Sequence, residues 1–218
     1  MIPTLCCVAS VPAAVGYVYV NRAQWFSTST VTTTSLPATS LTTGNHIFVY
    51  CTHEDATTSM TCTDTAGNTY IGLTATNRDN LVEGKWFYCL NATGHASNVV
   101  LVTLGAARAY IAATTVQFTG VGAAYDTETS GQNTATTVTS SSFNTAAGGL
   151  VLAGRGIYNA QTSTSYDSGL TMVDNSGNST TNYSSVGYLL TSSALSAQTI
   201  TETGNSSTRR CLQIAAFK

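Results

Sequence analysis

The chain has 218 residues and a net charge of −2 at pH 7; only 8% of its residues are charged, while 43% are hydrophobic. This length fits one large all-β domain or two small ones, and the hydrophobic content excludes a disordered chain. The eight Lys and Arg residues are scattered, so the clustered cations that bind phosphate backbones are missing and nucleic acid is not an expected partner.

The first 20 residues, MIPTLCCVASVPAAVGYVYV, are apolar. They lack the basic segment of an export signal, and Pro3, Pro12 and Gly16 interrupt a run that is already short for a membrane span. We therefore expect an ordered strand or assembly arm here, with an export signal as the alternative, and no membrane partner. The residues expected to dock on a neighbouring subunit are Ile2, Leu5 and Val8.

Short runs rich in β-branched and aromatic residues follow along the chain, separated by Gly, Asn, Asp and Ser. Before a polar stretch at 127–142 these runs are TLCCVAS, STVTTT, HIFVYCT, SMTCTD, TYIGLTA, KWFYCLN, NVVLVTL and AYIAATTVQF. After it they are GLVLAGRGI, LTMVD, SVGYLL, AQTITE and RCLQIAAF. No segment keeps a helical period. The series predicts an all-β, single-domain antiparallel β-sandwich with jelly-roll-like topology.

The two halves of the chain also resemble each other. The matching stretches are SLTTGNHIFVY with FNTAAGGLVLAG, GKWFYCLNATG with GYLLTSSALS, and AYIAATTVQF with RCLQIAAF. A four-strand unit of this kind cannot bury its inner face alone. We expect residues 36–126 and 143–218 to stack as two halves of one sandwich, and residues 1–35 to supply the arm and the first strands.

An Asp-x-x-Gly-Asn sequence occurs once in each half. Asp at the first position of a turn accepts backbone N–H bonds, and Gly supplies the positive φ of a type I turn with a G1 bulge, so we predict the same hairpin turn made twice. Calcium binding is the alternative, but each turn offers one carboxylate where calcium needs several oxygen ligands. The turn residues are Asp64, Gly67 and Asn68 in the first half and Asp174, Gly177 and Asn178 in the second.

The six cysteines show neither a CxxC pair nor zinc spacing. We interpret them as buried thiols that behave as small hydrophobic side chains. The exception considered is a disulfide between Cys51 and Cys62, because these two lie on consecutive predicted strands. The adjacent Cys6 and Cys7 point to opposite faces of a strand and are not expected to bond to each other.

Two groups of residues are candidates for catalysis. His53, Glu54 and Asp55 follow a strand and offer metal ligands or acid–base groups, although a solvated loop tip explains them equally. Asp126 and Glu128 would share a strand face, as a glycosidase pair does. The chain has no nucleophile elbow, phosphate-binding loop or dinucleotide fingerprint. We therefore expect no enzyme activity, no cofactor and no metal.

Read together, several of these motifs resemble those of β-sandwich proteins encoded in tailed-phage structural modules and in some bacterial surface proteins. That group combines a Gly-led strand, a T-D-x-x-G-N-x-Y turn, an aromatic strand, a G-x-N-x-V-x-V strand and a strand ending in an acid or Gln, an aromatic residue and S/T-G-V. The corresponding segments here are Gly44–Tyr50, Thr63–Tyr70, Trp86–Tyr88, Gly94–Thr103 and Gln117–Val121. The six cysteines, and Gln117 in place of the more usual acid, depart from the pattern.

The resemblance implies a virion structural protein of a tailed phage, most simply a capsid decoration (cement) protein or a tail component assembled in the host cytoplasm. Its partners would be copies of itself, a trimer being favoured, and other virion proteins. The low charge agrees, since unpaired charges at subunit contacts are costly. The alternative is a carbohydrate-binding module or adhesin on a phage tail or cell surface. It would stack surface glycans on Trp25, Trp86 and tyrosines and bind them through loop tips at 77–83 and 158–167. Trp86 itself is expected in the core.

Overall fold

A computed structural model of the chain describes residues 17–27, 29, 31–54, 57–120, 123–161, 164–178 and 181–218. The described residues form strands, turns and loops and no helix, which confirms the all-β prediction. The strands belong to two similar units, β1–β11 and β12–β19. The predicted subunit-contact residues Ile2, Leu5 and Val8, together with Cys6 and Cys7, lie outside the described residues.

The first unit has a large and a small sheet. The large sheet has the strand order β1 (Val18–Ser27), β11 (Ile111–Thr119), β4 (His46–Glu54), β8 (Val82–Cys89) and β6 (Ile71–Gly72), and β7 (Thr76–Arg78) also pairs with β8. The small sheet is β2 (Val31–Ser35), β10 (Val100–Arg108) and β5 (Met60–Asp64). Two short strands, β3 (Thr39–Leu41) and β9 (His95–Asn98), pair with each other.

The second unit repeats this plan with longer strands. Its large sheet has the order β12 (Tyr125–Thr139), β19 (Thr201–Phe217), β14 (Leu150–Gln161), β17 (Thr181–Leu190) and β16 (Thr171–Asn178). The first part of β19 pairs with β15 (Thr164–Tyr166), and β13 (Phe143–Thr145) pairs with β18 (Leu195–Gln198). Because the strand order is the same in both large sheets, the predicted internal repeat is confirmed.

Each unit has jelly-roll connectivity, because successive long strands alternate between its two sheets. In the first unit β1, β4, β8 and β11 lie in the large sheet, and β2, β5 and β10 lie in the small one. In the second unit the long strands β12 and β19 each serve both sheets in turn. The predicted sandwich of antiparallel sheets is confirmed, and within it the sheets form two units that stack on each other.

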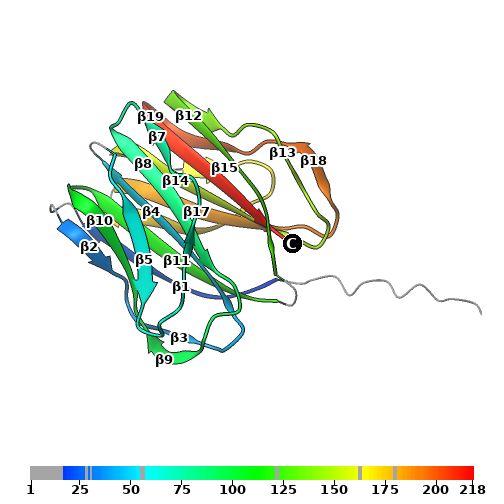
Figure 1. The fold of residues 1–218 in the computed structure, drawn as a ribbon. Helices are drawn as coiled ribbons and strands as arrows, with labels where there is room; N and C mark the ends of the chain where they lie inside the picture. The colour runs from blue at the N-terminus through cyan, green and yellow to red at the C-terminus, as the bar shows by residue number, and fades with distance from the viewer. Residues whose placement is uncertain are drawn as a thin grey trace, which may run out of the picture.

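The two large sheets lie face to face in the middle of the molecule, with the small sheet of the first unit and the β13–β18 pair of the second unit on the outside (Figure 1). Strand β4 shows why, because all nine of its residues are buried. Val49 and Cys51 face the small sheet, while Phe48 and Tyr50 face the second unit. This is the alternation of a strand with apolar layers on both sides.

The polar stretch at 127–142 is not a connection between the halves, because most of it is strand β12, paired with β19 along almost its whole length. Its Thr, Ser and Asn residues are those of an edge strand with an exposed face, which composition alone does not separate from a loop. β1 (Val18–Ser27) and β2 (Val31–Ser35) belong to the two sheets of the first unit, so they are the first strands expected within residues 1–35.

Of the two predicted turns, the first forms, with Gly67 at a positive φ and the Asn68 N–H bonded to the Asp64 carboxylate, but it is not a hairpin and the second stretch does not repeat it. Asp64 ends β5 in the small sheet and the chain then crosses to β6 in the large sheet, so this turn joins two sheets. Asp174 lies within β16, and Gly177 and Asn178 lie near the end of that strand; the side chain of Asn178 is outside the described residues. Pairing register places the true counterpart of the first turn earlier in the chain. Asp64 opposes Val100 as Tyr166 opposes Glu202, and Gly67 and Gly169 both have a positive φ, of 75° and 74°.

Candidate functional site

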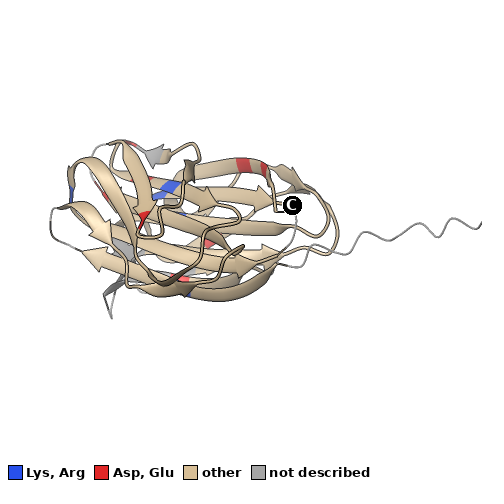
Figure 2. Cartoon of the chain, turned by 60° about the horizontal axis from the view of Figure 1, so that its bottom comes forward, with Lys and Arg blue, Asp and Glu red and all other residues tan. Residues whose placement is uncertain are grey.

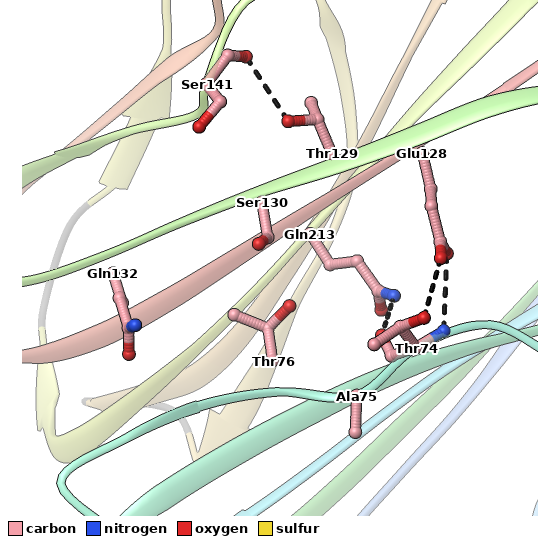
Figure 3. A pocket seen from close by; sticks show the side chains of 9 residues that line it. All are labelled: Thr74, Ala75, Thr76, Glu128, Thr129, Ser130, Gln132, Ser141 and Gln213. Carbon is pink, nitrogen blue, oxygen red and sulfur yellow. Dashed lines mark hydrogen bonds between the residues drawn. The ribbon is translucent and has the colours of Figure 1, made fainter.

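A polar groove of about 440 Å³ opens between β12 and the segment that leads into β7 (Figure 3). It lies where the second unit meets the first. Its lining consists almost entirely of hydroxyl, amide and carboxylate side chains, with one alanine. The lining residues are Thr74, Ala75, Thr76, Glu128, Thr129, Ser130, Gln132, Ser141 and Gln213.

Strand β12 supplies one wall of the groove through alternate residues. A bulge between Tyr125 and Thr127 shifts the register, after which Glu128, Ser130 and Gln132 lie on the face of β12 turned to the first unit. Their partners on β19 are Ala215, Gln213 and Cys211. In Figure 3 the Ser130 and Gln132 side chains point toward the 74–76 segment, from which Thr76 points back.

Gln213 fixes the opposite wall. It is buried, its Oε1 accepts a hydrogen bond from the Trp86 N–H at 2.8 Å, and its Nε2 donates to the Thr74 carbonyl. The Trp86 indole Nε1 donates in turn to the Gln213 carbonyl at 3.2 Å. Buried amide groups need such partners, so Gln213 ties β19 of the second unit to β8 and to the 73–75 segment of the first.

Glu128 is the charged group of the groove. Its Oε1 accepts a hydrogen bond from the Thr74 hydroxyl at 2.8 Å, and its Oε2 accepts one from the Thr74 backbone N–H at 3.3 Å. Within the described part of the chain no Lys, Arg or His forms an ion pair with Glu128. The carboxylate is half-buried and keeps contact with solvent.

The pseudo-equivalent junction lies between β1 and β16. Tyrosine pairs mark the correspondence: Tyr125 stacks on Tyr88 with ring centroids 5.9 Å apart, and Tyr19 stacks on Tyr188 at 5.8 Å, each pair with an interplanar angle of 4°. By pairing register Arg22 takes the place of Glu128. It opposes Val116, as Glu128 opposes Ala215.

The junction at Arg22 is closed by an ion pair. Arg22 Nη1 lies 2.8 Å from Asp174 Oδ1, and the Thr114 hydroxyl donates to Asp174 Oδ2. Asp174 stands where Thr74 stands in the other junction, and Thr114 stands where Gln213 stands. A smaller hollow of about 320 Å³ remains beside them. Asp174, predicted as a turn residue, is thus a buried carboxylate that joins the two units.

Asp64 forms a closed structural cluster. It accepts hydrogen bonds from the Asn68 backbone N–H at 2.9 Å and the Asn68 amide at 2.8 Å, from the Tyr70 hydroxyl at 2.9 Å, and from the Asn98 amide at 3.1 Å. Burial raises the pKa of Asp64, but these hydrogen bonds outweigh it and hold the pKa below its usual value. Four donors occupy the acceptor sites that calcium would need. No group of three or more His, Cys, Asp or Glu among the described residues is arranged to hold a metal.

The other catalytic candidates are separated or buried. His53 and Glu54 lie inside β4 and not at a loop tip, while Asp55 is outside the described residues. His53 Nε2 lies 3.2 Å from Glu83 Oε2, within ion-pair distance but without hydrogen-bond alignment.

The bulge in β12 also separates Asp126 from Glu128. Asp126 accepts from the Ala146 backbone N–H at 2.8 Å and pairs with Lys218 at 3.3 Å, whereas Glu128 faces Thr74. The glycosidase pair proposed from the sequence is therefore not formed.

Cys51 and Cys62 are free thiols in the core of the first unit, so the disulfide considered from the sequence is not formed. The two lie on strands of different sheets, β4 and β5, and not on a paired ladder. Burial raises the pKa of Cys51 to about 12, which keeps this thiol protonated and unreactive. Trp86 is buried as expected and offers no stacking platform, whereas Trp25 packs against the first core and stays partly exposed.

Sequence reasoning missed most of the groove. Thr74, Ser130 and Ser141 lie in stretches without a motif, and Gln213 lies within an apolar run. Its amide within the buried strand RCLQIAAF was the one available signal, because a buried amide needs hydrogen-bond partners. No protein-family model, curated protein or solved structure matches this chain. The described residues include no helix long and apolar enough to cross a membrane.

Proposed function

We propose that the protein is a structural subunit of a tailed-phage virion, a capsid decoration protein or tail component that acts through contacts with copies of itself and with other virion proteins. The observation that supports this most is the distribution of charge. The strands carry few charged residues (Figure 2). Of the ion pairs among the described residues, His53–Glu83, Arg155–Glu202 and Arg210–Glu202 are buried, and Arg22–Asp174 has one buried partner.

The core of the second unit contains three charged residues that pair with one another away from the surface. Glu202, Arg155 and Arg210 are fully buried, and Glu202 Oε2 lies 2.9 Å from Arg210 Nη1 while its Oε1 lies 3.6 Å from Arg155 Nη1. On the surface, Arg209 pairs with Asp79 at 3.2 Å. Lys218 pairs likewise with Asp126 at 3.3 Å, so part of the small outer charge is compensated within the chain.

The outer face of the small sheet in the first unit is uncharged. Thr33, Thr103 and Thr61 lie side by side across β2, β10 and β5, and all three are exposed. The next row consists of Ser35, Leu101 and Thr63. Hydroxyl groups lose less hydration energy than charged groups when another surface covers them, and they supply both donors and acceptors. Such a face suits packing against a second subunit, and a closed ring, with a trimer favoured, is the expected arrangement.

The test is the mass of the full chain in solution, measured by light scattering after size exclusion. The wild-type protein is expected to form a trimer, and Thr103→Glu, which places a charge at the centre of the hydroxyl face, is expected to shift it to monomer. Ser192→Glu, in an exposed loop away from this face, is the matched control and should leave the trimer unchanged. A monomeric wild-type chain at every concentration would contradict the proposal.

A further inference from the structure

The two junctions between the units differ in the size of the hollow that remains and in whether its carboxylate has a cationic partner. At the first, Arg22 neutralises Asp174 and the remaining hollow is small. At the second, the residue in the Arg22 position is itself a carboxylate, Glu128, and Thr74 faces it in place of an acid. The repeat therefore provides an internal reference in which the junction is closed. Measured against it, the Glu128 groove is larger and holds a carboxylate without a cationic partner among the described residues.

The lining of the groove restricts the chemistry of a ligand. It presents no cation, so phosphate and carboxylate ligands have no counter-charge there. It presents one apolar residue, Ala75, so it does not suit an apolar ligand. Thr76, Ser130, Gln132 and Ser141 offer groups that both donate and accept hydrogen bonds, and Glu128 accepts only. Ligand hydroxyl groups, which also donate and accept, match this set.

An aromatic ring stands beside the groove. Tyr125 lies on the same face of β12 as Glu128, remains 37% exposed, and is held in place by its stacking on Tyr88 and its edge contact with Phe217. An exposed tyrosine that is fixed by its neighbours offers a rigid apolar surface with a polar tip. The carbon-bearing face of a sugar ring fits such a surface while its hydroxyls reach the polar wall.

We propose that the Glu128 groove binds a short neutral saccharide, with Glu128 accepting from ligand hydroxyls, Ser130 and Gln132 completing the hydrogen bonds, and Tyr125 contacting the sugar ring. The volume lies within the range of about 300–1,000 Å³ of small-molecule sites. This site lies on β12 and not at the loop tips at 77–83 and 158–167, where the sequence had pointed. The inference goes beyond the proposed structural role and does not depend on it.

The test is isothermal titration calorimetry of the full chain with a panel of neutral mono- and disaccharides: glucose, galactose, mannose, N-acetylglucosamine, cellobiose and lactose. Putrescine serves as a cationic probe of the same carboxylate. Glu128→Gln, which keeps the shape of the side chain, is expected to weaken saccharide binding by at least about tenfold, because it removes a charged acceptor. Gln132→Ala should weaken it as well. Gln24→Ala, at the edge of the closed junction, is the matched control and should bind like wild type.

The proposal is overturned if no member of the panel binds, if putrescine binds and the saccharides do not, or if Glu128→Gln and Gln132→Ala bind as tightly as wild type. Thermal melting of each variant by circular dichroism separates a loss of binding from a loss of fold. Because the groove is remote in the fold from the Thr33–Thr103–Thr61 row, Thr103→Glu should leave saccharide binding unchanged. The two proposals therefore fail independently.

Discussion

The junction at Arg22 and the junction at Glu128 occupy equivalent places in the two units, and both carry the same stacked pair of tyrosines. They nevertheless use opposite chemistry. Asp174 is only 3% exposed and accepts from Arg22 and Thr114, whereas Glu128 is half-buried and, among the described residues, accepts hydrogen bonds from Thr74 only. A carboxylate taken out of water needs a cation or several donors; one that stays beside water does not. The first junction is therefore part of what holds the units together, and the second is free to take a ligand.

The largest expected effect comes from breaking the closed junction. Arg22→Ala leaves Asp174 buried without its cation and should lower the free energy of unfolding by about 3 kcal/mol, near the lower end for a broken buried pair because Arg22 is partly exposed. Urea denaturation measures this loss. Glu128→Ala is the matched control and should cost less than about 0.5 kcal/mol. Equal costs for the two variants would show that the junctions do not differ in the way described.

A second comparison lies at the turn after β5. Asp64→Asn should cost about 2 kcal/mol at pH 7, because Asn offers one acceptor oxygen to the donors that Asp64 satisfies. The folded pKa of Asp64 is lowered, so its stabilisation is complete above the ordinary carboxyl pKa of about 3.9 and is lost as the pH falls through the folded value. The gap between wild type and Asp64→Asn should therefore shrink below about pH 4 in acid-range urea denaturation.

Tyr166, at the equivalent position of the second unit, provides the control for that experiment. Its hydroxyl donates to the Ser185 carbonyl at 3.0 Å and does not titrate in acid. Tyr166→Phe should therefore cost the same at every pH at which the wild type stays folded. An Asp64→Asn gap that stayed constant down to acid pH would contradict the role given to the Asp64 carboxylate.

The closed junction can also be transplanted. Thr74→Asp alone brings a second carboxylate opposite Glu128 and should destabilise the protein by about 1 kcal/mol, and adding Glu128→Arg should recover that loss by recreating the Arg22–Asp174 pair. The coupling energy from the four proteins of this cycle is the measurement. Additive effects, with no recovery in the double variant, would mean that the two junctions are not geometrically equivalent.

The smallest effect is expected from the cysteines, which distinguish the interiors of the two units. Cys51 in β4 occupies the position that Arg155 occupies in the equivalent strand β14 of the second unit. The Cys51 thiol is buried and forms no disulfide. The melting temperature of the protein should therefore be the same with and without reductant, to within about 1 °C for a change far below 1 kcal/mol. A lower melting temperature in reductant would show that a disulfide forms after all.

The strand runs and the repeat could be predicted from the sequence, because β-branched runs such as HIFVYCT are local signals. The residue-by-residue correspondence between the two halves was harder to predict. The Asp174 stretch shares letters with the Asp64 turn, but ladder register makes Tyr166–Gly169 the counterpart. The groove could not be predicted, since Thr74 and Gln213 meet only through contact between the two units. The separation of Asp126 from Glu128 depends on a single bulge, which no sequence signal indicated.

The most direct test of the contrast between the junctions is a backbone amide NMR titration of the wild-type chain with the tightest-binding saccharide of the panel, because one spectrum reports both places. The account predicts saturable shifts at 74–76 and 128–132, with 22–24 and 172–174 unmoved. Shifts of equal size at both junctions, or shifts confined to the loops at 77–83 and 158–167, would contradict it.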